Sequence, residues 1–375
     1  MNVTQLPMAS GWYIDMPASV PWRVEFLLGM NPEFLGTLGG EDGCRRLSAE
    51  FYARVGQDPV LRPLFPGKSL RCAIEAFAAF LIQFLGGDEA QTQHRWWLSL
   101  RESHERFRIG PVERSAWLKH MQATLKAAPL DEGARMALGQ FFLQSSAYVV
   151  GSVAAEPEHE ELAARWASQR ALDDAIGAVA AGHDDEALAL VAQFAPRRSV
   201  FIGLLVRMIQ SGRTRLIRFV MDAVEREPSL ATCRFSGATL IHFACGAGCL
   251  EVVALLLRVG TGPNIEDGGG HTPLYRLANE CASETGPELV RELVRAGADV
   301  NACGGVTRAT ALHMAARRGF VKIAGALLDC GAAMEAKDSK GDTPLQRALN
   351  CRRDSVAQLL LKRGASGPAN PRASR

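Results

Sequence analysis

Hydrophobic residues in the first half of the chain recur every three or four positions, which is the spacing of amphipathic helices. The pattern predicts helices over residues 44–55, 70–85, 98–107, 112–127 and 131–153. Gly86 and Gly87 close the second of these, which is also the most apolar. No segment of this half alternates with the period of a strand, so we expect an all-α domain.

The second half repeats itself. The strings Thr239-Leu-Ile-His242, Thr272-Pro-Leu-Tyr275, Thr310-Ala-Leu-His313 and Thr343-Pro-Leu-Gln346 follow one another at spacings of 33, 38 and 33 residues. Glycines at 260, 297, 331 and 364 follow helical patterns at a matching phase, where a helix ends in a left-handed residue. Threonine can cap the first helix of each unit, and proline fits its first position without losing a hydrogen bond. This pattern resembles the ankyrin repeat, a turn and two antiparallel helices over about 33 residues.

The array carries several further expectations. The 38-residue spacing contains two extra pieces, residues 283–287 and 303–308, which we expect to form loops. Residues 168–232 are helical and are interpreted as degenerate or capping repeats. His242 and His313 are interpreted as histidines that stabilise turns. Cys245 and Cys249 have metal-ligand spacing on one helix, but no third ligand is evident and we prefer apolar packing.

Six ordered strings in the first half carry a second resemblance: Asp58-Pro-Val-Leu61, Leu64-Phe65-Pro66, Phe84-Leu-Gly-Gly87, His104-Glu-Arg-Phe107, Ile109 and Ala116-Trp-Leu-Lys-His-Met121. They resemble the truncated hemoglobins, and the group with tryptophan in the penultimate helix, group II, fits best. The resemblance covers about residues 36–150. It implies a two-over-two globin fold that binds heme b, so the fold class is an all-α globin followed by an ankyrin-repeat α-solenoid.

The resemblance also implies roles for individual residues. His104 holds the position of the proximal iron ligand, with His120 as the fallback, because one neutral imidazole suffices for heme iron. Tyr52 and Trp117 supply hydrogen-bond donors on the opposite, distal side. Phe65 replaces the corner tyrosine of many relatives. Ala73 stands where a polar distal residue is usual.

Other residues are expected to complete the heme site. Phe77 would line its apolar wall, together with Phe80 and Leu81, for which a plain core position is nearly as good an explanation. Cations would hold the heme propionates. Arg108 is the first choice and Arg101 the second, and Arg106 and Lys68 lie nearby; a solvated helix face is the alternative for these cations.

The net charge of +2 hides an uneven distribution. Residues 156–199 carry nine acidic and four basic groups, between two mildly basic blocks. We therefore expect an N-terminal extension at 1–35, a globin at 36–155, an acidic helical connector at 156–199, ankyrin repeats at 200–368 and a tail at 369–375. Balanced charge argues against a strongly basic nucleic-acid binder, and 47% apolar residues argue against disorder.

The sequence predicts a cytoplasmic protein. Nine cysteines without a paired motif, no charged region before an apolar leader, and no apolar stretch of spanning length support this expectation. The expected function is binding of dioxygen, and of NO or CO, at heme iron, joined to a module that docks a protein partner. Oxygen or NO sensing and NO dioxygenase or peroxidase-like chemistry both stay open. The alternative is an ankyrin scaffold whose globin-like domain has lost heme.

Overall fold

The computed structural model describes residues 33–65, 67, 69–88, 99–105, 107–151 and 157–366. Two compact units divide the chain, and the boundary falls between Phe201 and Ile202. Regular structure in the described residues is helical apart from one antiparallel pair of two-residue strands. The prediction of an all-α fold is therefore confirmed.

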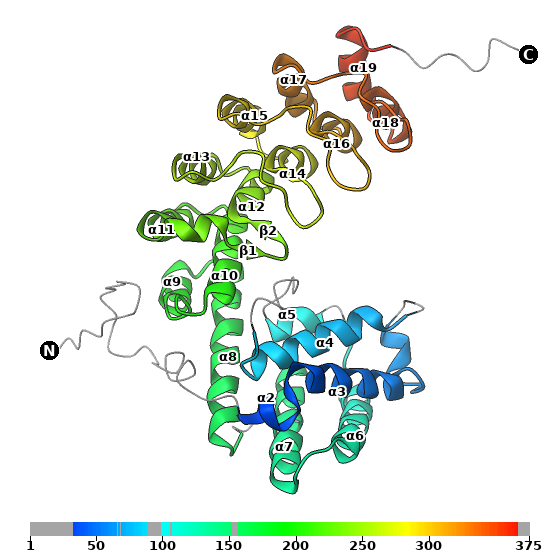
Figure 1. Cartoon of the computed structure of the whole chain (residues 1–375), viewed down its shortest axis with the longest axis vertical. Coiled ribbons are helices and arrows are strands. Elements are labelled where there is room, and N and C mark those ends of the chain that lie inside the picture. Colours follow the sequence, from blue (N-terminus) through cyan, green and yellow to red (C-terminus); the bar gives the residue numbers. More distant parts are fainter. Residues whose placement is uncertain are drawn as a thin grey trace, which may run out of the picture. The chain divides into compact units, whose positions relative to one another are not determined.

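The first unit contains a set of helices of very different lengths (Figure 1). They are α2 (Glu33–Thr37), α3 (Gly40–Val55), the 3-10 turn η1 (Arg62–Leu64), α4 (Arg71–Phe84), α5 (Leu100–Glu105), α6 (Pro111–Ala127), α7 (Glu132–Val149), α8 (Glu160–Ala181) and α9 (Asp184–Ala192). Helix α10 (Arg198–Ser211) contains the boundary between the units.

Two helix pairs form the body of the globin. Helix α3 packs on α4, α6 packs on α7, and α3 also contacts α6, which gives the two-over-two arrangement. The hydroxyl of Ser48 on α3 donates to the carbonyl of Ile74 on α4 at 2.7 Å. Phe51, Leu81 and Phe141 from three of these helices are each 1% exposed and belong to one continuous core. The hydrophobic faces predicted from spacing therefore meet.

Helix α8 contributes to the same core, although its sequence lies in the stretch expected to be a connector. Leu162 and Trp166 are almost fully buried members of the globin core. The Trp166 ring packs edge-on against Phe141 and Tyr148, with centroid distances of 5.8 and 5.1 Å. Helix α8 thus packs within the first compact unit.

Buried charged residues on α8 also contact other helices of the first unit. Arg165 pairs with Glu161 at 2.7 Å and donates to the carbonyl of Phe84 at the end of α4. Gly86 has a φ of +86°, and a side chain there would lie 2.7 Å from the Arg165 guanidinium. Glycine at this turn therefore serves both the left-handed backbone and the close approach of α8.

The second unit is a stack of helix pairs. It contains α11 (Thr214–Arg226), the 3-10 turn η3 (Pro228–Thr232), β1 (Arg234–Phe235), β2 (Ala238–Thr239), α12 (Leu240–Ala247), α13 (Leu250–Arg258), α14 (Pro273–Glu280), α15 (Gly286–Arg295), α16 (Ala311–Arg318), α17 (Val321–Asp329), α18 (Pro344–Asn350) and α19 (Asp354–Lys362). Helices α12, α14, α16 and α18 form one row, and α11, α13, α15, α17 and α19 form the other.

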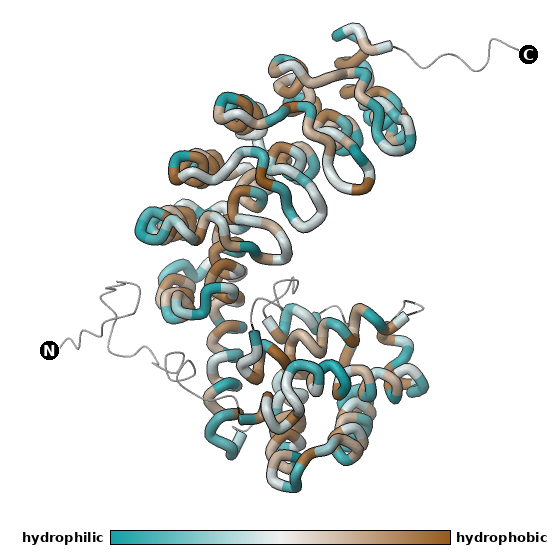
Figure 2. Tube along the Cα trace, in the orientation of Figure 1, coloured by the Kyte–Doolittle hydropathy of each residue, from teal (hydrophilic) through white to brown (hydrophobic). Residues whose placement is uncertain are grey.

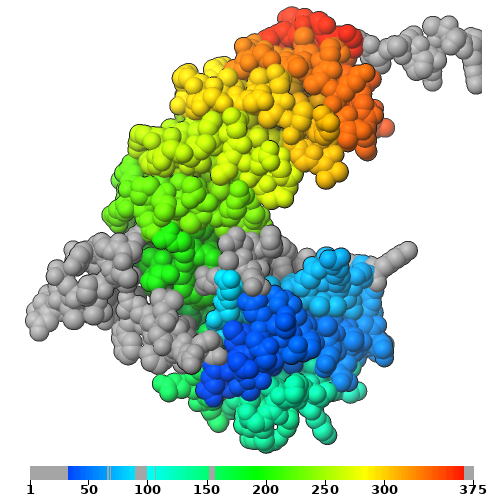
Figure 3. Space-filling model, in the orientation of Figure 1, coloured from blue at the N-terminus to red at the C-terminus, as the bar shows by residue number. Residues whose placement is uncertain are grey.

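Each repeat packs against its neighbours in sequence order. Figure 3 shows this as a continuous surface that passes from green to red along the stack. On helices such as α11 and α15, hydrophobic positions lie on the side of the helix nearer the row of α12, α14, α16 and α18. Hydrophilic positions lie on the opposite side (Figure 2). Burial is therefore shared between repeats, as expected for a solenoid.

The histidines of the repeat strings stabilise turns, as predicted. The Nδ1 atom of His313 accepts from the backbone N–H of Thr310 at 3.1 Å, while Nε2 bonds the carbonyl of Asp342 in the next repeat at 3.0 Å. His242 makes the equivalent bonds to Thr239 and His271. Burial lowers the pKa of both histidines, which keeps them neutral.

The turn residues also behave as expected. The glycines at 260, 297, 331 and 364 all have φ between 90° and 96°. Residues 303–308 lie in a loop closed by a bridge between Gly304 and Ala309. The other predicted loop is shorter than expected, because Gly286 and Pro287 already belong to α15.

Candidate ligand-binding cavity

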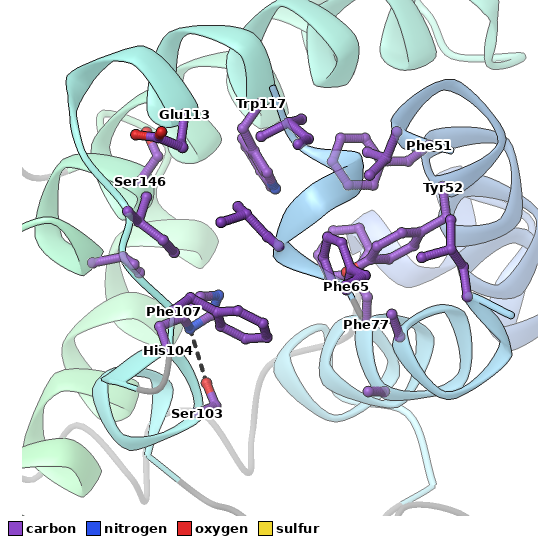
Figure 4. Close-up of a pocket in the computed structure, with 18 of the residues that line it drawn as sticks. Phe51, Tyr52, Phe65, Phe77, Ser103, His104, Phe107, Glu113, Trp117 and Ser146 are labelled. Atoms are coloured by element: carbon purple, nitrogen blue, oxygen red, sulfur yellow. Dashed lines mark hydrogen bonds between the residues drawn. The ribbon is translucent and has the colours of Figure 1, made fainter. Parts of the chain in front are cut away.

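A cavity of about 950 Å³ opens inside the globin unit, between α3, α4, α5, α6 and α7. Most of the residues predicted for the heme site line it, among them Tyr52, Phe65, Ala73, Phe77, His104, Arg108 and Trp117. Figure 4 shows His104 on one side and Tyr52 and Phe77 across the cavity from it. Residues separated by more than 60 positions thus line one cavity.

His104 lies near the end of the six-residue helix α5. Its Nδ1 atom lies 2.8 Å from the carbonyl oxygen of Leu100 and 2.9 Å from the Ser103 hydroxyl. A carbonyl oxygen can only accept, so Nδ1 carries the proton. This tautomer leaves the lone pair on Nε2, which is the form that a histidine needs in order to bind a metal.

Tyr52 and Trp117 bring polar hydrogens to an otherwise apolar space. Within the described part of the chain, neither the Tyr52 hydroxyl nor the Trp117 indole N–H has a hydrogen-bond partner. Figure 4 shows the indole nitrogen pointing into the cavity. Burial raises the pKa of Tyr52 well above the ordinary value, so the hydroxyl keeps its proton and can donate it.

Aromatic rings form the wall around these donors. The Tyr52 ring packs edge-on against Phe65 at 5.6 Å and Phe77 at 6.3 Å. Phe65 in turn contacts Phe107, which follows α5, at 5.6 Å. The small side chain of Ala73 leaves room beside them on α4. Phe80 also lines the cavity, whereas Leu81 is a core residue.

The fallback ligand His120 has a different environment. Its Nε2 atom lies 2.7 Å from the Asp58 carboxylate, which also accepts from the backbone N–H groups of Val60 and Leu61. The His120 pairing lowers the pKa of Asp58. His120 does not line the cavity, so His104 is the histidine that the structure places there.

Of the cations predicted to hold the propionates, Arg108 lines the cavity and Arg101 does not. Arg108 follows the end of α5, is exposed and lines the cavity. Arg101 does not line it, because its guanidinium stacks 4.1 Å above the Tyr148 ring on α7. Arg106 and Lys68 lie outside the described residues.

Sequence reasoning missed several residues at this site. Arg114 lines the cavity, and α7 holds its guanidinium through the Ser146 hydroxyl at 3.1 Å and the Leu143 carbonyl at 2.9 Å. Its spacing of three residues before Trp117 puts it on the same helix face and could have identified it. Ser103 was missed because its role, a bond to His104, depends on the backbone geometry of α5.

The donor set fits a heme. An apolar cavity and one histidine in the ligating tautomer are what a heme pocket needs, and two unbonded donors could bond a ligand on the iron. Elsewhere, no cluster of three histidine, cysteine or acidic side chains within the described ranges could hold a metal ion. None of the helices that the structure describes is long and apolar enough to span a membrane.

Comparisons with known proteins agree with this division of the chain. Residues 34–142 match the family model of bacterial-like globins, residues 236–268 match a single ankyrin repeat, and residues 278–370 match a model of three ankyrin repeats. Globins usually bind heme.

Similar curated proteins include three animal proteins. The human "Ankyrin repeat and SOCS box protein 16" is 32% identical over 38% of this chain and 33% of its own length. The mouse "B-cell lymphoma 3 protein homolog" is 32% identical over 39% of this chain and 32% of its own. The nematode (Caenorhabditis elegans) "Ankyrin repeat and KH domain-containing protein mask-1" is 37% identical over 36% of this chain and 5% of its own.

The chain thus spans a third or less of the length of these relatives. The family models, the helix order and the repeat geometry lead to one assignment. The chain carries a bacterial-like globin domain at residues 34–142, followed by ankyrin repeats at residues 236–370.

Proposed function

We propose that the globin unit binds heme b, with His104 as its protein ligand, and that the ankyrin repeats dock a protein partner. The observation that carries this proposal is the shared cavity, in which His104 faces Tyr52 and Trp117. Heme held by His104 would supply an iron centre that can bind a diatomic ligand such as dioxygen, NO or CO.

The chain's own residues would select and hold that ligand. Tyr52 and Trp117 would donate hydrogen bonds to a ligand that carries partial negative charge, as dioxygen does. The aromatic wall would keep water away, and Ala73 would leave the ligand room. Arg108 and Arg114, which both line the cavity, would pair with the propionates.

Two donors favour slow release of dioxygen over rapid delivery. Slow release suits oxygen chemistry, such as NO dioxygenation or peroxidase-like turnover. It also suits sensing, in which ligand binding at the heme changes the affinity of the repeats for their partner. Sensing requires that ligand binding and partner binding be energetically coupled. A cytoplasmic location remains part of the proposal.

Heme titration of the purified chain tests the proposal. We expect one equivalent of heme to give a Soret band that shifts when CO is added to the ferrous protein. A chain that takes up no heme would support the alternative, an interaction scaffold without cofactor. Partner affinity that is equal with and without CO would exclude sensing and leave the oxygen chemistry.

A further inference from the structure

Helix α5 is too short to be stable in isolation. It has six residues, so few of its backbone groups can bond within the helix, and contacts from outside set where it lies. Each of its first three N–H groups has an external or capping partner. The Ser99 hydroxyl accepts from Glu102, while the carboxylate of Asp173 accepts from Leu100 at 2.9 Å and from Arg101 at 3.3 Å.

Asp173 belongs to α8, in the stretch that the charge pattern marked as a connector. It is 5% exposed. Its Oδ2 atom also accepts from the Tyr148 hydroxyl at 3.2 Å, and its Oδ1 atom accepts from Gln169 at 2.9 Å. Four donors thus fix a buried carboxylate at the start of the helix that carries His104.

The peptide between Leu100 and Arg101 is hydrogen-bonded to both Asp173 and His104. The carbonyl of Leu100 accepts the His104 Nδ1 hydrogen at 2.8 Å, and the N–H of Arg101, in the same peptide, donates to Asp173 Oδ2. Hydrogen bonds in series polarise one another, and a carboxylate behind a ligating histidine raises the basicity of that histidine. Here the peptide between residues 100 and 101 transmits the effect.

We propose that Asp173 is a positioning residue for His104, which sets both the place of α5 and the donor strength of the His104 imidazole through the Leu100–Arg101 peptide. This inference rests on the proposed heme binding at His104. It makes α8 a part of the heme site, and not only of the hydrophobic core.

The test compares Asp173→Asn with Asp174→Asn, because Asp174 is the exposed acidic neighbour on the same helix. The first readout is amide hydrogen exchange of α5 in the heme-free chain. We expect faster exchange at residues 100–105 in Asp173→Asn alone, with the amides of α3 unchanged. Should Asp173→Asn not fold, Tyr148→Phe removes one donor to the carboxylate and is expected to give a smaller change at the same residues.

The second readout uses the heme-loaded chain. We expect Asp173→Asn to lower the stretching frequency of the bond between ferrous iron and His104 in resonance Raman spectra. We also expect it to speed heme loss about tenfold, the lower end of the range for residues behind a metal ligand. Asp174→Asn should match the wild type in both.

Three results would overturn the inference. Unchanged α5 exchange in Asp173→Asn would show that the carboxylate does not hold the helix. Faster exchange with an unchanged iron–histidine frequency would reduce Asp173 to a purely structural cap. A wild-type chain without a Soret band would refute the proposed function itself and the inference with it, whereas the first two results leave heme binding intact.

Discussion

Replacing Tyr52 by phenylalanine removes one oxygen atom from the cavity and keeps the ring. The ring contacts with Phe51, Phe65 and Phe77, at centroid distances of 5.1, 5.6 and 6.3 Å, remain available to the variant. The hydroxyl has no hydrogen-bond partner among the described residues. The ligand-free protein should therefore lose no stability, and the change in unfolding free energy should stay within about 0.5 kcal/mol.

The loss appears only when dioxygen is bound. A hydrogen bond to a charged group contributes about 1.5–3 kcal/mol, and each 1.4 kcal/mol is a factor of ten, so dioxygen should dissociate roughly 10- to 100-fold faster from Tyr52→Phe. Stopped-flow mixing of the oxygenated protein with excess CO measures this rate. Tyr275→Phe, which removes a hydroxyl from the repeats, is the matched control and should leave the rate unchanged.

Two outcomes would refute this reasoning. A dissociation rate for Tyr52→Phe equal to that of the wild type would show that the hydroxyl does not reach the bound ligand. A marked loss of stability in the heme-free variant would show that the hydroxyl is bonded within the protein.

Three further predictions concern the second donor, the core contact of α8 and the buried histidines of the repeats. Trp117→Phe should also speed dioxygen release, and the Tyr52→Phe/Trp117→Phe double variant should release it faster than either single variant; equal rates for all three would contradict two separate donors. Trp166→Ala should destabilise the globin unit by about 3–5 kcal/mol, measured by hydrogen exchange of α3 amides in the full chain, and a loss below about 1 kcal/mol would remove α8 from the core. The repeats should lose stability as the pH falls below about 6.5, because the unfolded chain then protonates a histidine whose pKa burial lowers in the fold. His313→Gln should weaken this pH dependence, because glutamine does not titrate; it should also keep the turn, since Gln346 makes the equivalent bond to Thr343 in the next repeat. Denaturant titrations at pH 7.5 and 5.5 measure the effect, and an unchanged dependence would contradict the assignment.

Local patterns in the sequence predicted the repeats well because each signature histidine has one partner within its own turn, besides its bond to the next repeat. Thr310 and His313, for example, bond each other across three positions, so their roles follow from spacing. The same holds for the left-handed glycines.

Helix α8 shows the limit of charge patterning. Nine acidic residues against four basic ones indicated an acidic helical connector, but composition does not reveal which charges are buried and paired. Asp173 and the Glu161–Arg165 pair are in contact with the globin. Leu162 and Trp166, four residues apart on one helix face, could have indicated that this face is buried.

The two arginines near His104 show a similar limit. Arg101 and Arg108 are three and four residues from it, so spacing alone does not separate them. The structure does, because α5 ends at Glu105 and leaves Arg108 beyond the helix, while Arg101 in the first turn stacks on Tyr148. Where a short helix ends depends on its partners, which the sequence does not show.

The central claim is that His104 holds heme in the cavity of the globin unit. The most direct measurement is the absorption spectrum of the ferrous chain before and after CO, on wild type, His104→Ala and His120→Ala, each mixed with one equivalent of heme. The account predicts a Soret band that CO shifts in the wild type and in His120→Ala, and loss of that spectrum in His104→Ala. Absence of the band in the wild type, or an unaltered spectrum in His104→Ala, would contradict it.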